Sequence, residues 1–405
     1  MEKKRTPRLR FRGFTDDWEQ RKLKELVKEI KRTDPNSSAP IMMITANDGF
    51  INQSERYSTD NAGKSLQKYI LLRKGELAYN HGASKLRPYG SCFALLDEKN
   101  ARIPYVYHCF SCGNENPEFL SLVLNSKAVE RQLRKLVSSG ARMDGLLNIT
   151  FDDYTSVPVM MPSRSEQKQI ANYIHTLNHL ITLHQRKYDM LKKVKKAMLE
   201  KMFPKNGKRV PEIRFAGFTD DWEQRKLSEM VIRYEDPIVT PHDGYTRLGI
   251  RSHAKGTFYE YVAPGHELET AQMHRVAADK LIFNITFAWE HAVAITTKDD
   301  AGKLVSHRFP QFTLSESLRP EFLKYIILDE GFHHNLYLAS PGGAGRNRVL
   351  KIDEALDYPI CFPSFEEQHK IGEFLNKLSN LITLHQRKLE KLQNLKKALL
   401  KKMFI

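Results

Sequence analysis

The sequence has few cysteines and no long apolar run. Its 405 residues contain four cysteines, too few and too scattered for the disulfide framework of a secreted protein. The N-terminus, "MEKKRTPRLRFRGF", carries basic residues but lacks the apolar segment that follows them in a signal peptide. No run approaches the roughly 18 apolar residues that a membrane-spanning helix needs. These absences favour reduced thiols and a cytoplasmic protein.

The sequence also lacks the short motifs of common catalysts. "AGKS" at 62–65 ends like a phosphate-binding loop, but Ser58 stands where the leading glycine belongs. H-E-x-x-H, G-x-S-x-G and the Asn/Asp-Pro-Pro-aromatic tetrad of adenine methyltransferases are all missing. Cys109-x-x-Cys112, next to His108, is half of a possible zinc site, but no second pair follows at ligand spacing. We therefore expect no catalytic residue and no metal in this chain.

Acidic residues are fewer than basic ones. Lys and Arg number 64 against 48 Asp and Glu, which gives a formal charge of +16 and a pI near 9.5. A surplus of this size favours a polyanionic partner, most often nucleic acid, although an ordinary basic protein remains an alternative. With 41% apolar residues and this length, the chain is expected to form about two folded domains.

Two stretches of the sequence occur twice. "GFTDDWEQRKL" stands at 13–23 and again at 217–227, and "LITLHQRK" stands at 180–187 and again at 381–388. The register holds to the pairs Met202-Phe203 and Met403-Phe404. Self-similarity with a period of domain size indicates a tandem duplication, and hence a pseudo-twofold internal repeat.

The segments between the repeats differ. Residues 24–161 and 228–362 are alike only in short pieces, such as "GELAYN" at 75–80 and "DKLIFN" at 279–284. Both contain strand-like runs, and both contain an amphipathic helix, at 116–136 and 319–338. We expect two heads of mixed α/β (α+β) structure, residues 1–162 and 204–363, with different surfaces.

The closing segments, 163–203 and 364–405, are predicted to be long helices of about 38 residues, or roughly 57 Å. Their apolar residues recur at alternating steps of four and three, as at the a and d positions of a coiled coil. Such helices need a partner, and we expect antiparallel pairing within the chain; packing of each helix only on its own head is the alternative. The seam comprises Ile170, Ile174, Leu177, Ile181, Tyr188 and Leu191, matched by Ile371, Leu375, Leu378, Ile382, Leu389 and Leu392.

Polar residues in both heads are candidate DNA contacts. Arg and Asn can hydrogen-bond to guanine and adenine edges, and Lys and Ser suit phosphates, although an exposed loop without a ligand explains any single residue equally well. In the first head the candidates are Asn80, His81, Ser84, Lys85, Arg87, Tyr89, Ser139 and Arg142. In the second head they are Asn284, Thr286, Trp289, His307, Arg308, Arg346, Asn347 and Arg348.

This layout resembles the specificity subunit of type I restriction–modification enzymes over essentially the whole chain. The resemblance rests on the two "RF-x-GFTDDWEQRKL" entries, the two helices that run through "LITLHQRK" to "MF", and "GRNRVLKIDEALDYPICFPSFEEQHKIGEFL". It implies two target-recognition domains separated by an antiparallel coiled coil. It also implies two modification (methyltransferase) subunits and further restriction (motor-nuclease) subunits as partners. S-adenosylmethionine, ATP and Mg²⁺ would bind to those partners and no cofactor to this chain, in a bacterial or archaeal cytoplasm.

The contrast between repeated frames and different heads suggests a functional hypothesis. Two different heads on a rigid spacer would read two different DNA half-sites, and the repeated surfaces would serve a partner that is used twice. The chain would then be a non-catalytic subunit that binds an asymmetric, bipartite DNA target. Two alternatives are a basic coiled-coil scaffold that binds RNA or protein, and a nuclease or methyltransferase with diverged motifs.

Overall fold

The computed structural model describes residues 6–46, 49–56, 63–137, 146–205, 207–268, 272–342 and 348–404. The chain divides into two compact units. Unit 1 comprises Met1–Gln185 with Arg387–Ile405, and unit 2 comprises Arg186–Gln386. The two long helices, α4 (Arg164–Lys201) and α8 (Phe365–Met403), each contribute one end to each unit. Among the described residues, no helix has both the length and the apolar character for crossing a membrane.

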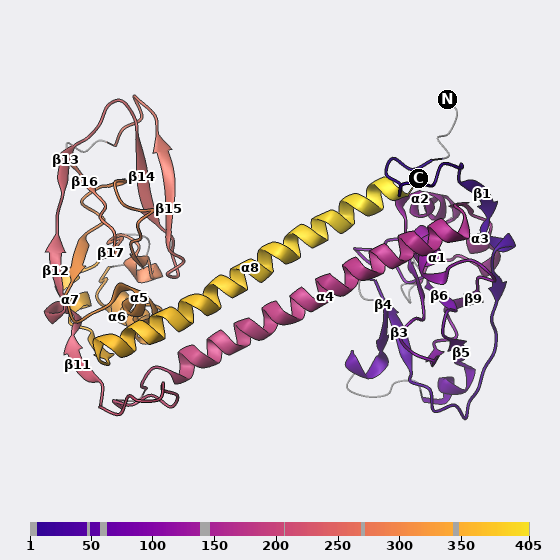
Figure 1. Cartoon of the computed structure of the whole chain (residues 1–405), viewed down its shortest axis with the longest axis horizontal. Helices are drawn as coiled ribbons and strands as arrows, with labels where there is room; N and C mark the ends of the chain where they lie inside the picture. The colour runs from indigo at the N-terminus through magenta and orange to yellow at the C-terminus, as the bar shows by residue number, and fades with distance from the viewer. Residues whose placement is uncertain are drawn as a thin grey trace. The chain divides into compact units, whose positions relative to one another are not determined.

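Unit 1 is built around a four-stranded sheet with the order β2-β9-β6-β7 (Figure 1). Three antiparallel pairs, β1–β10, β3–β4 and β5–β8, accompany it. The strands are β1 (Glu19–Lys22), β2 (Lys28–Glu29), β3 (Met42–Thr45), β4 (Gly49–Asn52), β5 (Ile70–Arg73), β6 (Leu77–Asn80), β7 (Ser91–Ala94), β8 (Asn100–Ile103), β9 (His108–Ser111) and β10 (Pro158–Met161). The shorter helices are α1 (Pro117–Leu124), α2 (Lys127–Leu136) and α3 (Phe151–Thr155).

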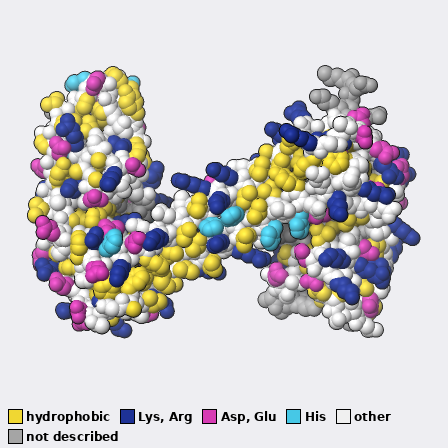
Figure 2. Space-filling model, viewed as in Figure 1, with side chains coloured by type: hydrophobic (Ala, Val, Ile, Leu, Met, Phe, Trp, Pro, Cys, Tyr) yellow, Lys and Arg dark blue, Asp and Glu magenta, His cyan; other side chains and the backbone are white. Residues whose placement is uncertain are grey.

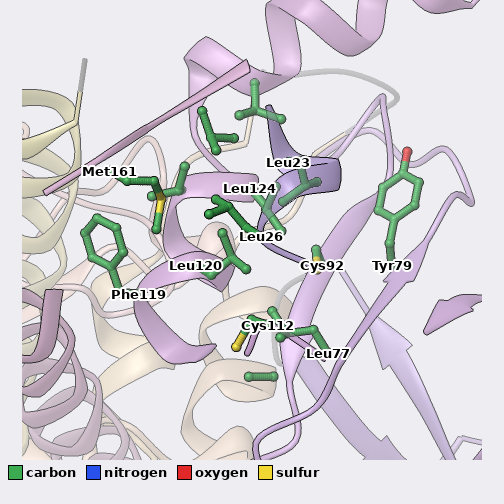
Figure 3. Close-up of a cluster of buried hydrophobic side chains, with 14 of the residues drawn as sticks. Leu23, Leu26, Leu77, Tyr79, Cys92, Cys112, Phe119, Leu120, Leu124 and Met161 are labelled. Atoms are coloured by element: carbon green, nitrogen blue, oxygen red, sulfur yellow. The ribbon is translucent and has the colours of Figure 1, made fainter. Parts of the chain in front are cut away.

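The main core of unit 1 lies between this sheet, helices α1 to α3 and the ends of the long helices. Figure 3 shows part of it, with Leu120 and Leu124 of α1 beside Leu77 and Cys92 of the sheet. A second cluster, which includes Ile44, Leu72 and Cys109, fills the space on the other side of the sheet. The alternation of side chains along a strand explains this division, because successive residues point to opposite faces.

Unit 2 contains a four-stranded sheet with the order β12-β20-β17-β18 and a five-stranded sheet with the order β13-β16-β19-β14-β15. The strands are β11 (Glu223–Lys226), β12 (Val231–Tyr234), β13 (Pro237–Val239), β14 (Tyr245–Ile250), β15 (Thr257–Val262), β16 (Gln272–Arg275), β17 (Lys280–Phe283), β18 (Val293–Ile295), β19 (Leu304–Val305), β20 (Gln311–Leu314) and β21 (Pro359–Phe362). The shorter helices are α5 (Pro320–Ile326), α6 (Glu330–Leu338) and α7 (Ile352–Leu356).

The four-stranded sheets of the two units have the same topology. In unit 1, β6 pairs with β7 and β9, and β2 extends the sheet beyond β9; in unit 2, β17, β18, β20 and β12 take the same order. β6 lies in the segment "GELAYN" and β17 lies in "DKLIFN". The units differ beyond this sheet, because only unit 2 adds a five-stranded sheet among the described residues. The prediction of two mixed heads with a shared frame is confirmed.

The repeated segments form the same contact between head and long helix in each unit. We call this contact the joint: it consists of the ion pair Arg10–Glu166 in unit 1 and Arg214–Glu367 in unit 2, with the side chains packed around it. The guanidinium of Arg10 donates two hydrogen bonds of 2.7 Å to the carboxylate of Glu166, in the first turn of α4. In unit 2, Arg214 makes the same pair of bonds, both 2.8 Å, with Glu367 in the first turn of α8. The two carboxylates are fully buried, so each joint depends on its arginine.

The closing Met-Phe pairs are part of the same joints. In unit 1, the ring of Phe404, after the end of α8, stacks on Phe119 with centroids 5.8 Å apart. In unit 2, the ring of Phe203, after the end of α4, stacks on Phe322 at 5.6 Å. Each long helix therefore starts on one head and ends in the core of the other unit. The alternative in which each helix packs only on its own head is wrong.

The seam residues lie between the long helices and the heads. In unit 1, the first half of α4 shares a buried cluster with the last turns of α8; in unit 2, the end of α4 shares one with the start of α8. This pairing is antiparallel, as predicted (Figure 1). Ile170, Ile174, Leu177, Leu191, Ile371, Leu375, Leu378 and Leu389 are buried, and Ile181, Tyr188, Ile382 and Leu392 are half-buried.

Candidate nucleic-acid interface

Three predicted segments of unit 2 lie side by side after β17. The backbone N–H of Ile285 donates to the carbonyl of Arg308 at 3.0 Å, and the N–H of Leu350 donates to the carbonyl of Ile285 at 2.9 Å. Thr286 and Trp289 follow Ile285, while His307 precedes Arg308. The segments 284–289, 306–308 and 348–350 thus form one surface region, although they are far apart in the sequence.

Arg348 has a defined position in this region. Its guanidinium carbon lies 4.4 Å from the ring centroid of Tyr337 and 5.7 Å from that of Trp289. Its Nη2 also donates to the Tyr337 hydroxyl at 3.2 Å. Trp289 is fixed in turn, because its indole N–H donates to the carbonyl of Thr286 at 3.2 Å. Stacking of this kind orients a guanidinium before a ligand arrives, which suits bidentate recognition of a base edge.

In unit 1 the corresponding region follows β6. The N–H of Leu147 donates to the carbonyl of His81 at 2.9 Å, as Leu350 does to Ile285 in unit 2. The loop that follows closes on itself, because the N–H of Arg87 donates to the hydroxyl of Ser84 at 3.0 Å. Lys85 is exposed at the tip of this loop, while Tyr89 packs against the core and its carbonyl accepts from the Tyr79 hydroxyl at 2.7 Å.

Three predicted contacts are used inside the protein. Both ring nitrogens of His81 lie on carbonyls, at 2.9 Å from Leu147 and 2.8 Å from Val106, and the residue is 8% exposed. The side-chain oxygens of Asn80 and Asn284 accept from the N–H two residues later, in Gly82 and Thr286. They form Asx turns, which shape the loops. These three side chains therefore shape the loops, and their contacts with bases stay predictions.

The other predicted contacts fall into two groups. Ser84, Lys85, His307 and Arg308 are exposed, and Arg87, Tyr89, Thr286, Trp289 and Arg348 are half-buried. Ser139, Arg142, Arg346 and Asn347 lie outside the described residues. The candidates that the structure brings together are therefore those after β6 and those after β17.

The turn between β14 and β15 was missed in the sequence. The hydroxyl of Ser252 donates to the Glu290 carboxylate at 2.6 Å, and the N–H of His253 donates to the Glu290 carbonyl at 2.8 Å. His253 and Ala254 have positive φ angles of 60° and 48°. Side chains rarely take this conformation, so the turn is held in shape by its contacts next to Trp289. Only a pairing across some forty residues places it there, and no local motif announces it.

A pair of histidines packs beside the segment 284–289. The rings of His291 and His333 are stacked with centroids 4.5 Å apart, and His291 Nε2 lies 2.6 Å from the carbonyl of Ile327. Burial lowers the pKa of His291, and the neighbouring histidine adds to this effect. His291 itself adopts a φ of 64°. The pair is structural, and its packing favours the neutral ring.

The cysteine pair of the possible zinc site does not converge. Cys109 lies in the cluster with Ile44 and Leu72, whereas Cys112 lies in the main core of unit 1. His108 Nε2 is engaged with the carbonyl of Ile149 at 2.9 Å. Burial raises the pKa of Cys112 to about 11, which opposes the thiolate that zinc requires. Within the described ranges, no group of three His, Cys, Asp or Glu side chains has a metal-binding arrangement.

These features define a class of protein. Each unit presents a polar, partly aromatic loop region after the same strand of the same sheet, and a paired helical segment joins it through a duplicated salt bridge. Loops of this composition on a rigid frame are typical of nucleic-acid recognition, and the loops of the two units differ in sequence.

Comparison with known proteins shows a family match in the second half of the chain. Residues 220–394 match the family model described as the type I restriction modification DNA specificity domain. The chain is 22% identical, over 95% of its length, to the type I restriction enzyme MjaVIII specificity subunit of Methanocaldococcus jannaschii, of which 91% is covered. It is also 22% identical, over 95% of its length, to the putative MjaX specificity subunit of the same organism, with 92% covered.

A solved structure supports the fold. The S subunit of a type I restriction–modification system from M. genitalium has a TM-score of 0.56 and 12% identity, and the comparison covers 99% of each chain. The predicted resemblance is confirmed: this chain is similar in sequence and in fold to the specificity subunits of type I restriction–modification systems. These matches support sequence-specific recognition of DNA as its function.

Proposed function

We propose that the chain reads an asymmetric, bipartite DNA target, with one half-site for each unit. The observation that carries this proposal is the shared sheet with different surroundings: β6 and β17 occupy equivalent places, but the loops after them have different sequences. Equivalent placement presents both loops to DNA in the same way, and different side chains recognise different bases. The base contacts proposed for unit 2 are Arg348, Trp289 and Arg308, and those for unit 1 are Lys85 and Ser84.

The proposal includes two copies of a modification subunit as partners. The repeated octapeptide exposes the same two leucines on each long helix: Leu180 and Leu183 on α4 are 38% and 51% exposed, and Leu381 and Leu384 on α8 are 43% and 46% exposed. Figure 2 shows hydrophobic side chains at the surface of these helices. Identical apolar surfaces on two helices fit one kind of partner bound twice. The partners would supply the S-adenosylmethionine-dependent methylation, and motor-nuclease subunits would add cleavage.

Methylome sequencing tests the recognition proposal. Cells that express this chain with its modification subunit should carry one adenine-methylated motif made of two different half-sites around unread bases. Cells with the modification subunit alone are the control and should lack that motif. A methylome in which no bipartite motif depends on this chain would contradict the proposal.

The paired helices are proposed to set the length of the unread spacer. Insertion of four residues after Arg186 adds about one helical turn, or roughly 6 Å, which is close to two base pairs. A matching insertion in α8 after Arg387 keeps the seam in register. We expect the double insertion to lengthen the unread spacer while both half-sites stay the same. Four residues inserted at 205–210, outside the helices, are the control, and an unchanged spacer in the double insertion would refute this role.

A further inference from the structure

Most of the net positive charge of the chain lies on the two long helices. Residues 164–201 contain nine Lys and Arg against three Asp and Glu, and residues 365–403 contain nine against four. Together they carry +11 of the formal charge of +16. The rest of the chain carries the remaining +5, so the helices contribute most of the net charge that attracts DNA.

Two cations meet at the joint in unit 2. The ammonium groups of Lys195 in α4 and Lys324 in α5 lie 5.7 Å and 5.1 Å from the centroid of the same ring, that of Tyr325. The ring is buried and fixed, because its hydroxyl donates to Asn376 Oδ1 of α8 at 2.8 Å. Burial lowers the pKa of both lysines, and for Lys324 the charge of Lys195 lowers it further.

Unit 1 has a second pair of cations at its own joint. Arg87, from the proposed reading loop, donates through Nη1 to the carbonyl of Asn125 at 2.9 Å, while its Nε is buried without a hydrogen-bond partner among the described residues. Lys396 of α8 belongs to the same unit and is half-buried. Burial lowers the pKa of Lys396, and Arg87 adds to this effect.

The two sites correspond through the duplication. Lys195 and Lys396 stand at matching positions of α4 and α8, within "LKKVKKA" and "LQNLKKA". Both head residues, Lys324 and Arg87, lie against the first helix of the head: Lys324 is in α5, and Arg87 bonds to the residue that ends α1. A cation pair in both copies, despite different head residues, points to a shared ligand.

None of these four cations forms an ion pair with a carboxylate in the described part of the chain. The charges of Glu321 and Glu130 act on Lys324 and Arg87, but these carboxylates are paired with other cations: Glu321 with Arg319 at 3.1 Å, and Glu130 with Lys127 at 2.7 Å. Half-buried like charges without a counter-ion destabilise the free protein. A bound anion would remove this cost.

We propose that the pairs Lys195–Lys324 and Arg87–Lys396 are two equivalent phosphate-binding sites, each of which holds a backbone phosphate of the DNA that the adjacent loop reads. This inference rests on the proposed function. DNA is favoured over an acidic protein surface for two reasons. Arg87 belongs to the reading loop itself, and α5 is tied to the other reading region, because the carbonyl of Ile327, directly after α5, bonds to His291.

Salt dependence of DNA binding tests these sites in the full chain with its modification subunit. The probes are a duplex with the target from the methylome and a random duplex of the same length. Lys195→Met with Lys324→Met should reduce the slope of log K against log salt by about 0.9 for one lost phosphate, or roughly 3.5-fold less salt sensitivity between 50 and 200 mM. Arg87→Met with Lys396→Met should do the same. Lys195→Met with Lys324→Met should not alter the methylated motif, because phosphate contacts carry no sequence information.

The matched control is Lys168→Met with Lys377→Met, which removes two exposed charges from the same helices. The inference is overturned if the slopes of the paired variants equal that of this control. It is also overturned, in favour of a protein ligand, if the variants lose the modification subunit while the slope stays unchanged. Without DNA, the paired variants should unfold at the same temperature as the wild type or higher. Failure of the wild type to prefer its target would instead count against the proposed function.

Discussion

The buried salt bridge at each joint gives a prediction that can be worked out in detail. In unit 2 the carboxylate of Glu367 is 1% exposed and accepts both of its 2.8 Å bonds from Arg214. Arg214→Met would leave this carboxylate buried without its counter-charge, which costs about 3–5 kcal/mol. The variant also loses the 2.7 Å bond from Arg214 to the carbonyl of Asp220, within the repeated "GFTDDW". The joint should therefore be among the most sensitive points of unit 2.

Thermal unfolding of the full chain measures this effect. For a unit the size of Arg186–Gln386, 1 kcal/mol shifts the midpoint by about 2–4 °C, so Arg214→Met should lower the midpoint of unit 2 by roughly 6–20 °C. Arg225→Met is the matched control, because its ion pair with Glu223 is 51% and 61% exposed and contributes below about 1 kcal/mol.

The double variant decides the physical cause. Arg214→Met with Glu367→Met replaces the buried pair by apolar side chains and should recover most of the lost stability. A buried ion pair rarely contributes more to stability than well-packed apolar side chains of similar volume. The reasoning is refuted if Arg214→Met unfolds like Arg225→Met, or if the double variant is as unstable as the single one. Arg10→Met and Glu166→Met should repeat the pattern in unit 1.

Three further predictions concern single positions. Gly372→Ala places a Cβ 2.6 Å from Cγ and 2.9 Å from the carbonyl oxygen of Glu321 and should cost about 1–3 kcal/mol by calorimetry, whereas Ala171→Gly at the matching position of α4 should cost only about 1 kcal/mol. Burial lowers the pKa of His291, so this residue takes up a proton at a higher pH in the unfolded chain than in the folded one, and unit 2 should lose stability as the pH falls below about 6.5. His291→Asn should reduce this loss, because asparagine tolerates the positive φ angle. Urea titrations at pH 5 and pH 7 measure the difference. Arg348→Lys should weaken discrimination at one base pair of one half-site by about 1–3 kcal/mol, measured by competition binding, and leave recognition of the other half-site unchanged. Lys351→Met is the neighbouring control and should leave recognition of both half-sites unchanged.

The frame of the fold could be predicted because its signals are local or repeated. The 4-3 spacing from Ile170 to Leu191 requires a one-sided helix, and its recurrence from Ile371 requires a second one. Antiparallel pairing follows from the duplication. The joints were not predictable in the same way: Arg10 and Glu166 are 156 residues apart, and nothing in either segment alone shows that the carboxylate is buried.

The interface was predicted less well because composition does not show where a side chain points. His81, Asn80 and Asn284 have the chemistry of base-reading residues, but β6 and β17 end there, and the loops need their hydrogen bonds to turn. Arg348 follows a glycine-rich segment in the sequence, yet its guanidinium is stacked on Tyr337 and Trp289, which no local pattern indicates. The likeness between "GELAYN" and "DKLIFN" is short, yet it marks the equivalent strands from which both loop regions start.

The two repeated segments have different explanations, and the difference bears on where a partner docks. "GFTDDWEQRKL" is accounted for inside the protein. Its Trp18 and Trp222 are buried, its Gly13 and Gly217 both adopt a φ of 94°, and its strands β1 and β11 pair with β10 and β21. The same contact between head and helix occurs in both units, and this accounts for the repetition of the segment.

"LITLHQRK" is only partly explained inside the protein: Ile181 and Ile382 pack in the seam and His385 is buried, but its leucines are exposed. The most exposed leucine in each copy is Leu183 on α4 and Leu384 on α8, and their side chains are 51% and 46% exposed. If these exposed leucines had no function, they would be expected to change to polar residues after the duplication, because such changes would leave the contact between head and helix intact. Their identity in both copies is therefore best explained by a surface that binds the same partner on each helix, which assigns the proposed modification-subunit contact to the octapeptide and not to the longer repeat.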